Sequence, residues 1–103
     1  MMKLVRALLH TADLDRVVTA LTREGFHGMT IAEIVHSDSR RAGRPHVTLR
    51  NEVTVALHSD RVDRLLRALH AAKVKRELEV TLQPLCQAVR IRTGERDQAA
   101  IWP

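Results

Sequence analysis

The stretch that decides the fold is VTLRNEVTVAL, residues 47–57, because apolar and polar side chains alternate along it. Successive side chains of a β-strand point to opposite faces of a sheet. The alternation therefore predicts a strand with one face against a core and the other face polar. The apolar side is formed by Val47, Leu49, Val53, Val55 and Leu57, and the polar side by Thr48, Arg50, Glu52 and Thr54.

Segments on both sides of this stretch have the patterns of three further strands. Residues 3–10 and 29–35 are short apolar runs, and residues 77–82 alternate again. We expect Pro84 to end the last strand, because proline cannot donate a ladder hydrogen bond. The polar segment 36–46 contains three arginines and has no periodicity, so it is predicted to be a loop.

Two amphipathic helices are predicted between the strands, because apolar residues recur there at helical spacing. Their core-facing residues are Leu14, Val17, Val18 and Leu21 in the first helix and Val62, Leu65, Leu66 and Leu69 in the second. Thr11 or Asp13 is expected to cap the first helix and Ser59 the second, while Gly25 ends the first in a left-handed conformation. The order of elements predicts one ferredoxin-like βαββαβ domain of the α+β class over residues 1–103.

The composition disfavours several classes of function. Lys and Arg number 17 against 12 Asp and Glu, a formal net charge of +5, yet Phe26 and Trp102 are the only aromatic residues. The charge suits a basic nucleic-acid-binding ferredoxin-like module, but the scarcity of rings for base stacking disfavours it. Six histidines lack the spacing of a compact metal site, and no nucleophile or carboxylate pair lies in a catalytic motif. We expect neither a metal nor an enzyme.

The single cysteine and the lengths of the apolar runs indicate in which cellular compartment the protein is expected. Cys86 is the single cysteine and cannot form an internal disulfide, which favours a reducing compartment, and its apolar neighbours predict a buried side chain. No apolar run approaches the roughly 20 residues needed to cross a bilayer. We therefore expect a cytoplasmic protein without direct membrane insertion.

Arg90 and Arg92 are expected to form one concentrated positive site. They alternate in VRIRTG, residues 89–94, which reads as a short extended run that breaks at Gly94. Residues i and i+2 of an extended run project to the same face. Two guanidinium groups on one face suit a phosphate or carboxylate ligand.

Three stretches resemble the PII signal-transduction family. RIRTGERDQAAI, residues 90–101, resembles the C-terminal signature of the family, and GFHGMTIAEIV, residues 25–35, is similar to its second strand. Residues 2–25 are similar in length and pattern to its first strand and helix. The resemblance implies a homotrimeric, non-enzymatic regulator that binds adenine nucleotides in clefts between subunits. It also implies that the protein controls a target protein, a transporter or a metabolic enzyme.

The resemblance further implies which residues meet the nucleotide. The Gly28, Met29 and Thr30 positions would contact the adenine, with the Thr30 hydroxyl beside the backbone of the other two. Arg90 and Arg92 would contact the phosphates. Residues 90–103 would then form a C-terminal loop and tail at the ligand.

Two loops depart from the pattern of the family. The T-loop, which begins with a Gly-Arg-Gln-Lys-Gly type sequence in the family, is replaced by a shorter segment within residues 36–46 that lacks tyrosine and offers Arg40 for the phosphates. The glycine-rich B-loop is replaced by a glycine-free linker at residues 73–77, in which Lys75 supplies charge without a backbone anion nest. Without that nest, ADP or AMP is expected to bind at least as well as ATP.

The second effector is expected to differ from that of the family. Arg41 replaces the glutamine that helps to organise the 2-oxoglutarate site, and it is joined by Arg44 and Arg50. Guanidinium groups suit a compact anion held directly, such as bicarbonate, better than a dicarboxylate bridged by magnesium. A nitrogen-status regulator that responds to 2-oxoglutarate is the alternative.

Overall fold

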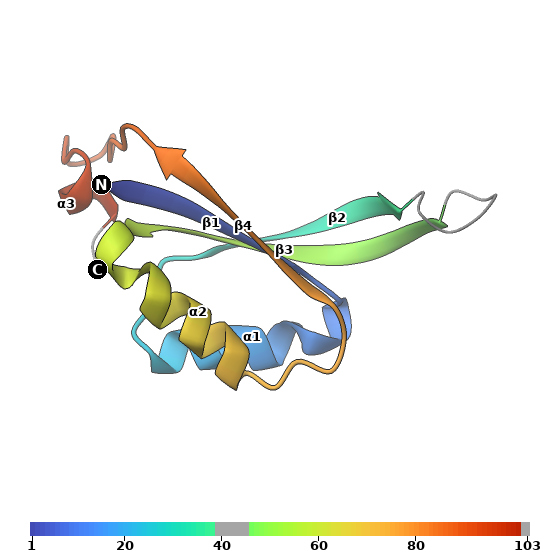
Figure 1. The fold of residues 1–103 in the computed structure, drawn as a ribbon. Helices are drawn as coiled ribbons and strands as arrows, with labels where there is room; N and C mark the ends of the chain where they lie inside the picture. The colour runs from blue at the N-terminus through green and yellow to red at the C-terminus, as the bar shows by residue number, and fades with distance from the viewer. Residues whose placement is uncertain (39–45, 102–103) are drawn as a thin grey trace.

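The structure, a computed structural model, describes residues 1–38 and 46–101 and contains one four-stranded antiparallel sheet. The strands β1 (Met2–Leu9), β2 (Thr30–Asp38), β3 (His46–His58) and β4 (Leu78–Leu85) lie in the order β2-β3-β1-β4. Helices α1 (Leu14–Arg23) and α2 (Val62–Ala71) follow the 3-10 turns η1 (Thr11–Asp13) and η2 (Ser59–Arg61). Figure 1 shows both helices on one side of the sheet. The predicted ferredoxin-like βαββαβ fold is confirmed.

The core lies between the two helices and the central strands β1 and β3. Val5 lies opposite Val55 and Ala7 opposite Val53, so these side chains share the helix-covered face. Val5 and Val53 are each 1% exposed. The helices add apolar side chains at helical spacing, among them Val17, Leu21, Leu65 and Leu69. The alternation in the sequence therefore identified the buried face of β3 over its second half.

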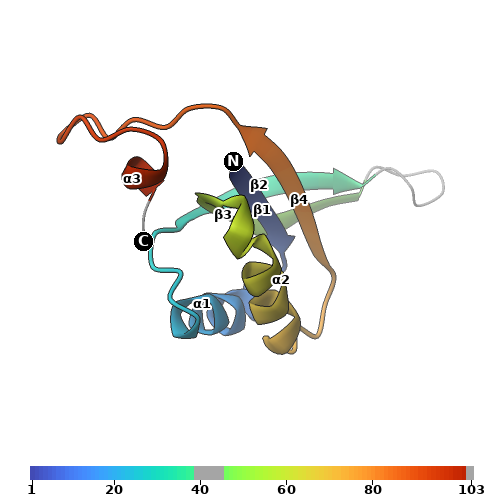
Figure 2. The same ribbon diagram turned by 60° about the vertical axis from the view of Figure 1, so that its left-hand side comes forward.

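The opposite face of the sheet is not covered by α1 or α2 (Figure 2). Leu4, Arg6 and Leu8 point to this face, because they alternate with Val5 and Ala7 along β1. The short helix α3 (Gln98–Ile101) comes back beside the sheet at the end where β1 begins. This end of the uncovered face is where the candidate site lies.

Strands β2 and β3 form a long hairpin that extends past the helices (Figure 1). The ladder continues to the pair formed by Asp38 and His46. The predicted loop over residues 36–46 is therefore wrong at its ends, because strand pairing takes up the flanking residues. The remaining part of that loop, residues 39–45, lies outside the described residues.

The extended part of the hairpin leaves apolar side chains exposed. Val47 and Leu49 are 60% and 57% exposed, and Val35, which pairs with Leu49, is 68% exposed. The expectation that Val47 and Leu49 face the core is wrong, because the helix layer ends before their part of β3. Their alternation is typical of a strand, but β3 extends beyond the part of the sheet that the helices cover.

Histidine side chains cap the 3-10 turns that lead into the two helices. Nδ1 of His10 accepts a hydrogen bond of 3.0 Å from the N–H of Ala12. Nδ1 of His58 accepts one of 3.2 Å from the N–H of Asp60. Thr11, Asp13 and Ser59, which were the predicted caps, lie in the 3-10 turns. Asp13 does stand at the N-cap position of α1, but its side chain makes no capping hydrogen bond there.

The same capping arrangement occurs twice because the two halves of the domain repeat. Residues 9–21, LHTADLDRVVTAL, and residues 57–69, LHSDRVDRLLRAL, share Leu-His, Asp-Arg and Ala-Leu at matching places. Each segment leads from the end of a strand through a 3-10 turn into a helix. The repeat is visible in the sequence, and it accounts for the same histidine contact at the start of both turns.

Of the two residues predicted to end an element, Gly25 does so and Pro84 does not. Gly25 ends α1 as predicted, with a φ of +88° and a hydrogen bond of 3.0 Å from the N–H of Phe26 to the carbonyl oxygen of Leu21. Pro84 does not end β4, which continues to Leu85. Because β4 is an edge strand, its outer side needs no backbone donor and tolerates the proline.

Candidate functional site

A pocket of about 480 Å³ lies on the uncovered face of the sheet, at the end of the sheet beside α3. A cavity of this size is large enough for a small organic ligand. Gly28, Thr30 and Arg90, which the sequence placed at a nucleotide site, all line it. The full lining consists of Leu4, His27, Gly28, Thr30, Thr54, Ala56, Arg90, Ala100 and Ile101.

Strand pairing gives the pocket its polar and apolar walls. Thr30 of β2 lies opposite Thr54 of β3, which brings two hydroxyl groups to one side. Leu4 of β1 lies opposite Ala56 of β3, which supplies an apolar floor. An apolar floor with a few placed polar groups is the usual composition of a small-molecule site.

Gly28 leaves free space at the pocket, and Met29 packs against the core on the other side of the chain. A Cβ atom placed on Gly28 would meet no other atom within 4 Å, so the space beside its backbone is free. Met29 is half-buried and packs against the core. Of the predicted adenine-contacting positions, Gly28 and Thr30 line the pocket, and the side chain of Met29 points to the core side.

Arg90 reaches the pocket from the segment that follows β4. Its Nη2 donates a hydrogen bond of 2.9 Å to the carbonyl oxygen of Ala100, and its Nη1 lies 3.7 Å from Oε1 of Glu95. The side chain remains 47% exposed. Because a guanidinium carries five N–H donors, Arg90 can hold α3 and still offer donors to an anion in the pocket.

The predicted extended run at Arg90 and Arg92 is wrong. The N–H of Gly94 donates to the carbonyl oxygen of Arg90 at 2.7 Å, and the N–H of Arg90 donates to that of Glu95 at 2.8 Å. Gly94 has a φ of +75°, which glycine adopts readily and which closes the chain into a turn. The shared-face argument therefore fails. Arg92 is exposed and does not line the pocket.

Lys75 and Arg50 lie away from the pocket within one chain. Leu4 at the pocket and Leu9 at the far end of β1 are separated by about 17 Å at the usual strand rise. Leu9 pairs with the first residue of β4, and Lys75 lies just before that strand. Nη1 of Arg50 donates a hydrogen bond of 3.3 Å to the carbonyl oxygen of Leu49, in the direction of the hairpin tip. The remaining predicted anion contacts, Arg40, Arg41 and Arg44, lie outside the described residues.

Comparison with known proteins identifies the family. The model of the family "Nitrogen regulatory protein P-II" matches residues 2–95. The nitrogen regulatory protein P-II of Rhizobium etli is 30% identical, and the alignment covers 97% of this chain and all of that protein. The chain belongs to the P-II family. The P-II protein of Synechocystis sp. is 32% identical and the nitrogen regulatory protein GlnK of Escherichia coli 27% identical, each over 97% of this chain and all of the relative.

Solved structures support the P-II fold. The crystal structure of Arabidopsis thaliana PII bound to citrate matches with a TM-score of 0.81 and covers 97% of this chain and 89% of that chain. The sequence identity in this match is 19%, so it shows the fold. The expected family is confirmed, and with it the interpretation that this P-II protein is a signal-transduction regulator.

Some pocket residues of this P-II chain were missed by sequence reasoning. His27 lies directly before Gly28 in a stretch that was singled out, and its position next to a site glycine was the available signal. Ala100 and Ile101 come from α3, which was not predicted. Its placement depends on the turn at residues 90–94, and strand periodicity gives no information about that turn.

Other predictions for this P-II chain concern cysteine, metals and membranes. Cys86 is exposed, so the predicted burial is wrong; it follows the last residue of the edge strand and leaves the sheet with the chain. Within residues 1–38 and 46–101, no group of three His, Cys, Asp or Glu side chains is placed to hold a metal ion. No helix in the same residues is long and apolar enough to cross a membrane.

Proposed function

We propose that this P-II protein senses adenine nucleotide and transmits its binding state to a target protein. The observation that carries the proposal is the pocket at Gly28, Thr30 and Arg90. It combines an open backbone, two threonine hydroxyls, an apolar floor and a half-exposed guanidinium. ADP and AMP are the expected ligands, with ATP as a further candidate.

Each wall of the pocket suits one part of a nucleotide. The apolar floor at Leu4 and Ala56 suits the flat face of a base, and the hydroxyl of Thr30 can hydrogen-bond the edge of that base. The guanidinium of Arg90 suits a phosphate, because charge-assisted hydrogen bonds to an anion are short and strong. Arg92 stays a candidate second phosphate contact, on the exposed side of the same turn.

The position of Lys75 supports a site shared between subunits. Within one chain Lys75 lies just before β4, at the end of the sheet opposite to the pocket that Arg90 lines. A ligand that meets both side chains must therefore lie between two copies of the protein. The uncovered sheet face, with Leu4 and Leu8 pointing outward, offers the surface for such an assembly, and we propose a homotrimer packed through it.

A small anion such as bicarbonate is the proposed second effector, held directly by arginine. Arg50 is half-buried on the uncovered side of the hairpin, its Nη1 donates to the carbonyl oxygen of Leu49, and a guanidinium carries five N–H donors in all. Arg41 and Arg44, which lie between β2 and β3 in the sequence, are proposed to join Arg50.

The function is tested by calorimetry and light scattering on the intact protein. Titration with ADP, AMP and ATP, with and without magnesium, should show saturable binding, and the mass should be about three times that of one chain. A monomer that binds no nucleotide at millimolar concentration would remove both the trimer and the shared site. A strong preference for ATP with magnesium would contradict the proposed effect of the glycine-free linker.

A further inference from the structure

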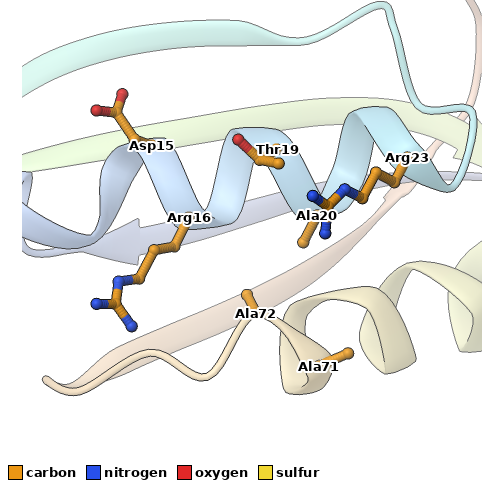
Figure 3. Close-up of a pocket in the computed structure, with 7 residues that line it drawn as sticks. All are labelled: Asp15, Arg16, Thr19, Ala20, Arg23, Ala71 and Ala72. Atoms are coloured by element: carbon orange, nitrogen blue, oxygen red, sulfur yellow. The ribbon is translucent and has the colours of Figure 1, made fainter.

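A groove runs between α1 and α2 on the outer side of the helix layer, away from the sheet and from the pocket at Arg90. We call it the helix seam. It contains two hollows of about 320 and 340 Å³, which share Ala71. Figure 3 shows the first hollow, with Arg16, Ala20 and Arg23 on α1 and Ala72 at the end of α2. The second hollow is lined by Glu24, Arg64, Arg67, Ala68 and Ala71.

The helix seam follows from the internal repeat. Arg16 and Ala20 occupy the same places in the first repeat as Arg64 and Ala68 in the second. Residues i and i+4 lie on the same face of a helix, so each helix presents an arginine followed by an alanine. The seam therefore has an alanine floor between arginines, and the two halves of the domain contribute equally to it.

The two helices run in opposite directions, which places one repeat arginine at each end of the helix seam. Arg16, near the start of α1, donates a hydrogen bond of 3.3 Å to the carbonyl oxygen of Lys73, just beyond α2. Arg64, near the start of α2, donates one of 3.2 Å to Oε2 of Glu24, just beyond α1. These contacts join the two helices at both ends of the seam.

The helix seam carries excess positive charge. Glu24 is paired with Arg64 at 3.2 Å. In the part of the chain that the structure describes, no carboxylate lies within ion-pair distance of Arg16, Arg23 or Arg67. These three guanidinium groups are therefore available to carboxylates of another molecule.

We propose that the helix seam docks an acidic amphipathic helix of a partner protein. The alanine floor lets the small apolar ridge of a third helix enter the groove, as in ridges-into-grooves packing. Carboxylates flanking that ridge meet Arg16, Arg23 and Arg67 in charge-assisted hydrogen bonds. A second copy of this chain fits poorly here, because its own outer helix faces would bring further arginines against Arg16, Arg23 and Arg67. The positive charge of the seam would also attract nucleic acid, but none of the lining residues is aromatic, so the seam offers no ring for base stacking.

This docking surface is separate from the proposed nucleotide site and does not depend on it. The seam lies on the helix side of the sheet, and the pocket lies on the uncovered side. A partner bound along the seam would leave the pocket accessible. The surface accordingly offers a contact with a target protein that leaves the nucleotide site free.

The probe for the test is a synthetic helical peptide with an alanine and leucine ridge flanked by glutamates. Fluorescence anisotropy measures its binding to the intact protein. Arg67→Glu is expected to weaken binding about tenfold, because it removes one charge-assisted contact and adds repulsion. Ala71→Phe fills the floor shared by both hollows without changing charge, and it should weaken binding to a similar extent. The matched control Arg96→Glu, an exposed arginine outside the seam, should leave affinity unchanged.

Several outcomes would overturn the proposal. Equal weakening by Arg67→Glu and Arg96→Glu would show that diffuse charge alone attracts the peptide. Equal binding of a peptide with the same composition in scrambled order would show that no helix is recognised. Duplex DNA that displaces the peptide and binds more tightly would assign the seam to nucleic acid. ADP titrated into Arg67→Glu should bind as in the unmodified protein, which separates failure at the seam from failure of the nucleotide site.

Discussion

Nη2 of Arg90 donates a hydrogen bond of 2.9 Å to the carbonyl oxygen of Ala100, which holds α3 at the edge of the pocket. The same guanidinium is the cation that lines the pocket. Arg90 therefore has two roles, one in positioning the end of the chain and one in the proposed binding of phosphate.

Replacing Arg90 with alanine should weaken ADP or AMP binding by about tenfold or more, because a hydrogen bond to a charged group contributes about 1.5 to 3 kcal/mol. Calorimetry on both proteins measures the difference. Arg92→Ala is the informative comparison, because Arg92 lies in the same turn without lining the pocket. We expect a smaller effect from it. Equal affinity in the unmodified protein and in Arg90→Ala would remove Arg90 from the site.

The open space beside Gly28 predicts a separation of stability from binding. Gly28→Ala should change the free energy of unfolding by no more than about 0.5 kcal/mol, as is usual for a substitution without a steric conflict. The new methyl group would meet no protein atom within 4 Å but would project beside the pocket. Nucleotide affinity should therefore fall while the urea midpoint stays in place. A loss of stability without a loss of affinity would contradict this account of the pocket.

The strands and the core could be predicted from the sequence, because periodicity reports directly on burial. Val53 and Val55 alternate in the sequence and are buried in the structure. Gly25 was predicted correctly because its left-handed conformation has a specific residue preference. Val47 continues the same alternation and is exposed, because periodicity does not report how far the helix layer extends.

The candidate site was predictable in part. Gly28, Thr30 and Arg90 were identified through resemblance to the family, and they meet at one pocket. The spacing of Arg90 and Arg92 did not predict where their side chains lie. Residues i and i+2 share a face only in an extended chain, and here the chain forms a turn. The separation of Lys75 from the pocket follows from strand order and register, which the sequence alone does not supply.

The histidine cap of η1 predicts a measurable loss of stability. His10→Ala removes the acceptor for the N–H of Ala12 and should lower the free energy of unfolding by about 1 kcal/mol, the usual cost of losing a cap. His10→Asn should recover most of it, because asparagine is a good cap. Urea denaturation gives the values. His70→Ala, at an exposed position of α2, is the control and should have little effect. Equal stability of His10→Ala and the unmodified protein would show that the cap contributes nothing.

A buried carboxylate beneath the linker predicts coupling between two residues. Asp13 is 1% exposed, its Oδ1 lies 3.6 Å from Nη1 of Arg76, and its Oδ2 has no hydrogen-bond partner among the described residues. Arg76→Ala should destabilise the fold by about 1 kcal/mol or more, since it leaves a buried charge without a partner, although Arg76 itself is half-exposed. Adding Asp13→Asn should recover part of the loss, which a double-mutant cycle by urea denaturation measures. Strictly additive effects would exclude the coupling.

The last prediction concerns the second effector and the charge of the hairpin. Arg50 is half-buried beside the ladder, and its Nη1 donates a hydrogen bond to the carbonyl oxygen of Leu49, which uses one of its five donors. Arg50→Ala should therefore weaken bicarbonate binding to the ADP-bound protein by about tenfold, since it removes a direct charge-assisted contact. Calorimetry with bicarbonate and, separately, with 2-oxoglutarate measures both effectors. Arg96→Ala removes an equal charge away from the hairpin and should leave bicarbonate affinity unchanged. Binding of 2-oxoglutarate with no response to bicarbonate would instead support a nitrogen-type effector site, in which a metal-bridged dicarboxylate does not need Arg50 as its direct partner.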